Sequence, residues 1–326
     1  MILSGKAIAF LFLCLSASMT FAAAPPGKVP RIGFLVLDEK HCRNEHFIAG
    51  LRELGYEDGK SIVIECWHAG GNDERLPRVA EELARSRPAV IVAHNHIWAL
   101  AAQQATKEIP LVVISSGDPI LSGFAASLAR PGGNITGLTY FALELNAKRL
   151  ELLKIVVPGL KRVAVIKNPK TPPVLGDAYL RETRAAAQAF GIELIIVEAT
   201  SEPELERAFD QIVKAKAQAV YVFASLIFGE MMQKIADLAM WHNLPTMHFH
   251  KRYPAIGGLM AYAPDYDILH RRTATYVDKI LEGAKPADLP FEQPARFEFT
   301  INLATARELG LNVPQSLLLR ADKVIE

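Results

Sequence analysis

The chain has 326 residues, and at roughly 100–200 residues per domain this length indicates two domains. Its composition of 50% hydrophobic and 22% charged residues is typical of a globular protein with a large core. The 36 basic and 35 acidic residues leave a net charge of +1. No basic stripe stands out, so we expect no nucleic-acid partner.

The N-terminus shows the order of charge, apolar run and small residues that is typical of a secretory signal peptide. Lys6 supplies the charge, residues 7–21 are uncharged and mostly apolar, and Ala22 opens a run of small residues. We therefore predict that residues 1–24 are a signal peptide cleaved near Ala22, and that the mature protein is periplasmic. An uncleaved anchor helix is the alternative, although the run is shorter than the roughly 20 apolar residues of a membrane span.

Three cysteines are present. Cys14 would be the lipid-attachment site if the protein were a lipoprotein. However, Leu13 precedes it where a lipoprotein signal has a small residue. Cys42 and Cys66 survive processing, and an oxidising compartment permits a disulfide between them. Because the sequence does not show that their Cα atoms meet, it leaves the pairing open, and we favour unpaired thiols over a bridge.

From residue 31 onward, short apolar segments rich in β-branched residues alternate with segments of helical periodicity. The strand-like segments are 31–37, 61–67, 89–93, 111–115, 162–167, 193–199, 219–224 and 245–249. The helix-like segments between them include 46–54, a segment opened by Asp73, 181–190 and 229–241. This alternation predicts parallel sheets that are covered by helices on both faces.

After residue 250 the pattern changes, with strand-like segments at 257–265 and 297–303 around a helix at 268–281. A chain that starts in one lobe, builds another and turns back forms a multi-strand hinge, and such hinges let rigid lobes close on a ligand. The predicted fold class is α/β, with two doubly wound parallel-sheet lobes.

We place lobe one at residues 31–140 plus about 264–326 and lobe two at 141–263, and leave the assignment of the final segment open.

Ligands of open α/β sheets bind beyond the carboxyl ends of the strands, so the candidate ligand-binding residues are those that follow the strands. They are His94, Asn95, His96, Trp98, Ser115, Ser116, Gly117, Asp118, Asn168, Ser225 and His248, with Tyr262 and Asp265 at the crossover. Hydrogen-bonding groups and aromatic rings with few charges suit a small polar or zwitterionic molecule that has an apolar part.

Roles within such a site follow from the side chains. Trp98 suits stacking on a ring, and Asp118 or Asp265 suits pairing with an ammonium group. A carboxylate would find donors at Asn95, Ser115 and Ser116.

Ordinary structural explanations also fit several of these residues. Asp118 and Asp265 both fit helix caps. Trp98 fits a core position, and Asn168 before a proline fits a turn.

The histidine pairs His94/His96 and His248/His250 follow strands in different lobes, and convergence would give a transition-metal site. No acidic residue is spaced with either pair to complete a helical metal motif. We therefore expect hydrogen bonds from single histidines, with no metal and no cofactor.

Enzyme signatures are lacking: the sequence has no G-x-S-x-G elbow, no G-x-G-x-x-G and no P-loop. The turn at 130–134 owes its glycines to backbone conformation rather than to phosphate binding. We expect no enzymatic activity. A secreted enzyme that uses the interlobe cleft and a ligand sensor module are the rival classes.

Long segments resemble the ABC transporter substrate-binding proteins of the family that includes bacterial tryptophan and tyrosine transport receptors. The matching segments are 47–65, 74–83, 117–139 with its LARPGGN at 128–134, 148–169, 257–265 and the C-terminal block 276–326. The resemblance covers nearly all of the mature chain. It implies the type I periplasmic binding protein fold, solute uptake and a permease as membrane partner; we expect a monomer.

The resemblance also implies site residues. In such receptors the loops after strands three and four hold the polar head of the ligand, which corresponds to Asn95 and to Ser116, Gly117 and Asp118. The second-lobe turn corresponds to Asn168, and the crossover to Tyr262 and Asp265.

At three places in the predicted ligand site, this sequence departs from the usual pattern of the family it resembles. Residues 94–98 stand where the family usually has small residues, Lys167 stands where it has an apolar residue, and Ser225 stands where it has an acidic one. The expected function is an extracytoplasmic solute-binding component of an ABC uptake transporter, which closes on an amino-acid-like molecule or an aromatic carboxylate.

Overall fold

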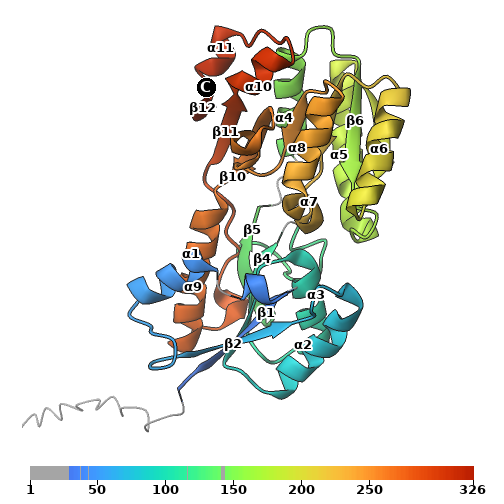
Figure 1. The fold of residues 1–326 in the computed structure, drawn as a ribbon. Coiled ribbons are helices and arrows are strands. Elements are labelled where there is room, and N and C mark those ends of the chain that lie inside the picture. Colours follow the sequence, from blue (N-terminus) through green and yellow to red (C-terminus); the bar gives the residue numbers. More distant parts are fainter. Residues whose placement is uncertain (1–28, 37, 43, 116, 141–143) are drawn as a thin grey trace, which may run out of the picture.

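Two α/β lobes, one above the other, make up the described part of the chain (Figure 1). The computed structural model describes residues 29–326 except 37, 43, 116 and 141–143. The predicted signal peptide at 1–24, its cleavage point and Cys14 lie outside these residues. Among the residues described, no helix is long and apolar enough to cross a membrane.

Lobe one contains a five-stranded parallel sheet in the order β2-β1-β3-β4-β5. Its strands are β1 (Arg31–Val36), β2 (Val63–His68), β3 (Val90–Ala93), β4 (Leu111–Ser115) and β5 (Ile135–Thr139). Every residue of β3, β4 and β5 is buried, because parallel strands between two helical layers read as continuous apolar runs.

Helices of lobe one pack in two pairs, α1 with α9 and α2 with α3 (Figure 1). They are α1 (Glu45–Glu53), α2 (Leu76–Arg85), α3 (His96–Ala105) and α9 (Tyr266–Leu281), with the 3-10 helices η1 (Glu39–His41), η2 (Asp73–Arg75) and η4 (Pro286–Asp288).

Lobe two contains a seven-stranded sheet in the order β12-β11-β10-β9-β8-β6-β7. Its strands are β6 (Arg162–Lys167), β7 (Glu193–Glu198), β8 (Ala219–Val222), β9 (Thr246–His248), β10 (Met260–Pro264), β11 (Phe297–Asn302) and β12 (Lys323–Ile325). All pairings are parallel except that of β10 with β11.

Helices of lobe two cover this sheet. They are α4 (Glu144–Val156), α5 (Pro173–Phe190), α6 (Glu202–Lys214), α7 (Leu226–Glu230), α8 (Met232–Trp241), α10 (Leu303–Glu308), α11 (Gln315–Leu318) and the 3-10 helix η3 (Tyr253–Ile256). The sequence pattern placed the start of α5 near residue 181, whereas the helix begins at Pro173, a residue that suits the first turn.

The final segment 264–326 divides between the lobes. The sequence placed it in lobe one and left that assignment open. α9 packs against α1, whereas β11 pairs with β10 and carries β12 beside it. Phe299 and Ile301 are buried in the core of lobe two, and their burial explains why this strand joins the second sheet. The assignment of β11 and β12 to lobe one is therefore corrected, and the chain crosses between lobes after β5, after β10 and before β11.

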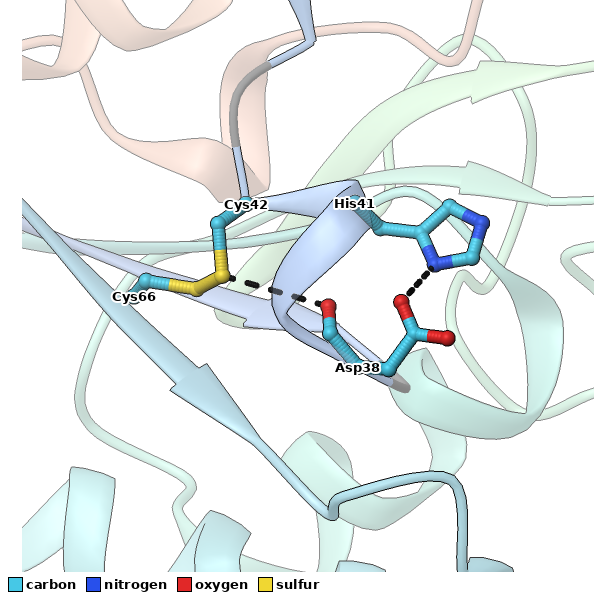
Figure 2. Close-up of a disulfide and its surroundings, with 4 residues drawn as sticks. All are labelled: Asp38, His41, Cys42 and Cys66. Carbon is cyan, nitrogen blue, oxygen red and sulfur yellow. Dashed lines mark hydrogen bonds and ion pairs between the residues drawn. A yellow bond between two sulfur atoms is a disulfide. The ribbon is translucent and has the colours of Figure 1, made fainter.

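Cys42 and Cys66 form a disulfide (Figure 2), contrary to the expectation of unpaired thiols. Their Cα atoms lie 5.4 Å apart, inside the usual range for a bridge. Parallel pairing places Cys66 of β2 beside Phe34 of β1, and η1 brings Cys42 back to the same sheet. The bridge therefore depends on strand register and on a turn, and neither can be read from the spacing of the cysteines.

The disulfide should stabilise lobe one. For a sequence separation of 24 residues, the chain-entropy estimate gives about 3 kcal/mol of unfolding free energy. We expect Cys42→Ala/Cys66→Ala to lower the urea midpoint of unfolding by a corresponding amount. A reducing agent should lower the midpoint of the native protein and leave that of the double variant unchanged; equal midpoints for the two oxidised proteins would contradict the prediction.

Candidate functional site

A cavity of about 280 Å³ lies between the lobes. Lobe one contributes Gly71, Asn95, His96, Ile97 and Trp98. Lobe two contributes Asn168, Lys170, Thr171, Pro172, Leu175, Tyr179, Thr200, Ala224, Ser225, Leu226, Ile227 and Glu230. A larger hollow of about 890 Å³, near Cys42 and Cys66, is lined by lobe one alone. Of these two hollows, the shape of the interlobe cavity depends on how the lobes meet.

Three polar residues reach the cavity because each directly follows a buried strand or begins the next helix. Asn95 is the N-cap of α3, and its side chain accepts a hydrogen bond from Ile97 N. Asn168 follows β6; it accepts from Lys170 N and donates from Nδ2 to Ser225 Oγ at 3.1 Å. Ser225 occupies the N-cap position of α7. The ends of β3, β6 and β8 thus supply the polar part of one cavity.

His96 presents a neutral imidazole. Only 4% of the residue is exposed, and Nδ1 lies 2.7 Å from Ser115 Oγ. Ser115 is fully buried and accepts from Gly117 N. Burial lowers the pKa of His96 to about 4, so at neutral pH the ring offers a hydrogen-bonding group rather than a charge.

Aromatic and aliphatic side chains from both lobes form the apolar part of the cavity. Trp98 is 3% exposed and belongs to the core of lobe one, and it also lines the cavity. The core position is confirmed, and stacking on a ligand ring stays a prediction. Tyr179 of α5 packs against Phe223 in lobe two. Leu175, one helical turn before Tyr179, lies on the same face of α5.

The lobes touch each other around this cavity. Leu226 of α7 packs against the core of lobe one. A Cβ placed on Gly117 would come within 2.6 Å of Leu175 Cδ1. His41 Nε2 of lobe one lies 3.1 Å from Glu230 Oε1 of lobe two. These contacts describe a closed arrangement.

The other predicted histidines lie away from the cavity. His94 Nδ1 lies 2.9 Å from Nδ1 of His270 on α9, and the ring packs against Phe34 and Phe47. His248 is fully buried and stacks on Phe249 and Tyr253.

The two histidine pairs therefore do not converge. His250 stacks on Tyr266, away from His96. Within the described ranges, no group of three or more His, Cys, Asp or Glu side chains is placed to hold a metal ion.

The predicted acidic partners of an ammonium group do not line the cavity. Asp118 Oδ1 accepts from Ile120 N and Leu121 N and so caps a turn. Asp265 is the N-cap of α9, and its carboxylate lies 2.7 Å from Lys251 Nζ.

The remaining predicted residues divide in the same way. Tyr262 packs against Phe297 on a different face of lobe two. Gly117 lies next to the ring of His96 and is not among the residues that line the cavity. Ser116 is outside the described residues.

The cavity also contains lining residues inside helices that the sequence does not reveal, above all Leu175, Tyr179, Leu226 and Glu230. These residues do not directly follow a strand, which is where ligand-binding side chains are expected in open α/β sheets. The spacing of Leu175 and Tyr179 by four residues was the one available signal.

Comparison with known proteins decides the family. The profile of the family described as ABC transporter substrate binding protein matches residues 34–325. The chain belongs to this family. Family members are typically periplasmic, and the fold of two α/β lobes is that of type I periplasmic binding proteins.

Individual relatives agree with this assignment. The chain is 26% identical over 266 residues to a tyrosine-binding protein of Clostridioides difficile (strain R20291), covering 81% of this chain and 75% of the relative. A conserved domain protein from Vibrio cholerae superposes with a TM-score of 0.83 and 25% identity, over 91% of this chain and 100% of that one. A domain from Streptococcus pneumonia in complex with L-Trp superposes with a TM-score of 0.82 and 23% identity, with the same coverage.

Buried histidines should make the protein less stable in acid. Burial is the main cause that lowers the pKa of each of His94, His96, His248, His250 and His270. Between about pH 6.5 and pH 4 the unfolded chain therefore binds more protons, and each histidine lowers the unfolding free energy by up to about 1.4 kcal/mol per pH unit.

Urea unfolding at a series of pH values measures this slope. We expect His96→Gln to make this slope shallower, because the amide side chain does not titrate in this pH range. An unfolding free energy that is constant from pH 7 to pH 4.5 would contradict the prediction.

Proposed function

We propose that this protein is the extracytoplasmic solute-binding component of an ABC uptake transporter. The observation that carries the proposal is a small cavity lined by both lobes in a member of the substrate-binding family. The protein acts by binding, without catalysis, and delivers its ligand as a monomer to a permease in the cytoplasmic membrane. The signal-peptide pattern of residues 1–24 supports export.

Capture works through the hinge. In the open form a ligand meets Asn95, His96 and Trp98 of lobe one, and closure adds Asn168, Ser225 and the side chains of α5 and α7. Since only the closed form makes both sets of contacts, ligand binding shifts the population towards it. The permease then distinguishes loaded from empty protein by the arrangement of the lobes.

The ligand class that we propose is an amino acid with an aromatic or large apolar side chain. The cavity volume is close to the lower end of small-molecule sites, which is about 300 Å³. Trp98, Leu175 and Tyr179 supply apolar surface, and Lys170 supplies a cation suited to a carboxylate. The tyrosine-binding relative and the similar fold crystallised with L-Trp support this class.

A thermal-shift assay with the free amino acids and with glucose tests the ligand class. A ligand that binds only the folded state raises the melting temperature with its concentration. We expect L-tyrosine or L-tryptophan to raise it and glucose to leave it unchanged. If no amino acid shifts the transition, the proposed ligand class is wrong.

Lys170→Ala tests the role of the cavity's cation. We expect about tenfold weaker binding of the amino acid by calorimetry, the size expected for one lost charge-assisted hydrogen bond. The melting temperature without ligand should not change, because the side chain is exposed. Lys214→Ala, at the exposed end of α6, is the matched control and should bind as the native protein does. Unchanged affinity in Lys170→Ala would exclude this residue as the carboxylate partner.

A further inference from the structure

The imidazole of His96 is held on three sides. Its Nδ1 lies 2.7 Å from Ser115 Oγ, and its ring packs against the ring of Phe124 with the two centroids 5.3 Å apart. On the third side, a Cβ placed on Gly117 would come within 2.7 Å of His96 Cε1 and within 2.6 Å of Leu175 Cδ1. These contacts fix the orientation of the ring at the wall of the cavity.

The second ring nitrogen of His96 is the one that a ligand can reach. Nε2 has no hydrogen-bond partner among the residues that the structure describes, and it is not one of the side-chain nitrogens that are both unpartnered and sealed from solvent, as Nε2 of His94 and of His248 are. His96 lines the interlobe cavity. Nε2 is therefore the polar atom that this ring presents to the cavity.

Ser115 determines which ring nitrogen of the neutral imidazole carries the hydrogen. Its hydroxyl has one hydrogen and two possible acceptors, His96 Nδ1 at 2.7 Å and Gly117 O at 3.2 Å. Gly117 O also accepts from Thr139 Oγ1 at 3.0 Å. The shorter distance, which is typical of an O–H donor, and the second donor to Gly117 O both favour donation to Nδ1. Since a neutral imidazole has one N–H, this hydrogen is then on Nε2.

The depth of His96 indicates which part of a ligand it contacts. The residue is 4% exposed, whereas Lys170, the cation proposed for the carboxylate, is exposed at the edge of the cavity. An amino acid whose carboxylate pairs with Lys170 extends its side chain inwards, towards His96. Because a donor that loses water and meets no acceptor is costly, the end of that side chain has to supply an acceptor.

We propose that His96 is a specificity residue that requires a hydrogen-bond acceptor at the end of the ligand's side chain. Ser115 is its positioning residue, since it holds the ring with the hydrogen on Nε2. The phenol oxygen of tyrosine accepts such a hydrogen bond, the phenyl ring of phenylalanine does not, and the indole N–H of tryptophan is only a donor. The inference rests on the proposed function and narrows its ligand class to amino acids that carry this acceptor.

NMR spectroscopy of the ligand-free protein, labelled with ¹⁵N-histidine, tests the position of the hydrogen without any ligand. Two-bond ¹H–¹⁵N correlations at pH 7.5 distinguish a protonated from an unprotonated ring nitrogen, and His96→Leu identifies the signals of His96 by their loss. We expect a protonated Nε2 in the native protein and a mixture of both tautomers in Ser115→Ala. A native ring protonated on Nδ1, or a Ser115→Ala ring with the native pattern, would overturn the assignment.

Calorimetry with L-tyrosine and L-phenylalanine, which differ by one hydroxyl group, tests the specificity. We expect the native protein to bind tyrosine about tenfold more tightly, because phenylalanine leaves the Nε2 donor unpaired. His96→Leu should bind both amino acids with equal affinity, and Ser115→Ala, which keeps the imidazole, should lower the ratio of the two affinities. His68→Leu, at the exposed end of β2, is the matched control and should keep the native ratio.

Two outcomes of this calorimetry separate the specificity from the proposed function. Equal affinities of the native protein for tyrosine and phenylalanine, or a tenfold ratio that persists in His96→Leu, would overturn the specificity of His96 and leave amino-acid capture intact. Failure of the native protein to bind either amino acid would contradict the proposed ligand class and the specificity that rests on it. The NMR result decides the role of Ser115 in both cases.

Discussion

Buried parallel strands determine where this protein places its chemistry. Inside β3, β6 and β8 almost every backbone group is paired and the interior side chains are apolar, so polar side chains first appear where a strand ends. Asn95, Asn168 and Ser225 occupy such positions. Asn95 and Asn168 each accept a hydrogen bond from a backbone N–H two residues later, and Ser225 occupies the N-cap position of α7. All three residues also line the cavity. The requirement to cap the backbone and the requirement to bind a ligand are met by the same residues.

The hinge brings these strand ends together. Because the chain crosses between lobes after β5, after β10 and before β11, each lobe remains a separate packed body with its own core. The antiparallel pairing of β10 with β11 anchors the returning segment in lobe two, while α9 belongs to lobe one. In the proposed function, the crossing segments form the hinge, and the cavity is the space that hinge motion opens and closes.

Charge is distributed unevenly over the site. Inside the cavity, burial keeps His96 neutral, and its partner Ser115 is uncharged, so recognition there rests on shape and hydrogen bonds. The cation of Lys170 is exposed at the edge of the cavity. In the proposed function, the uncharged interior recognises the shape and hydrogen-bonding groups of the ligand, and Lys170 pairs with its carboxylate.

Much of this was accessible from the sequence, since alternating apolar and helical segments predict the two lobes and strand ends predict Asn95, His96, Asn168 and Ser225. The sequence did not reveal Leu175, Leu226 or Glu230, which reach the cavity only through contact between lobes. Nor did it reveal the Cys42–Cys66 bridge, which needs the register of β1 with β2.

The orientation of His94 also exceeded what the sequence can give. The His94 side chain contacts His270 on α9, a helix far along the chain, whereas His96 begins α3 and contacts Ser115. In each case the missing information is a contact between distant segments rather than a local preference.

Native mass spectrometry of the purified protein after incubation with a mixture of free amino acids tests the central claim most directly. We predict one bound molecule with the mass of an aromatic or large apolar amino acid. We expect no such adduct for Ala224→Phe, because the new ring occupies the interlobe cavity that Ala224 lines. A native protein that appears only at its own mass, or an adduct that Ala224→Phe retains in full, would contradict amino-acid capture in the interlobe cavity.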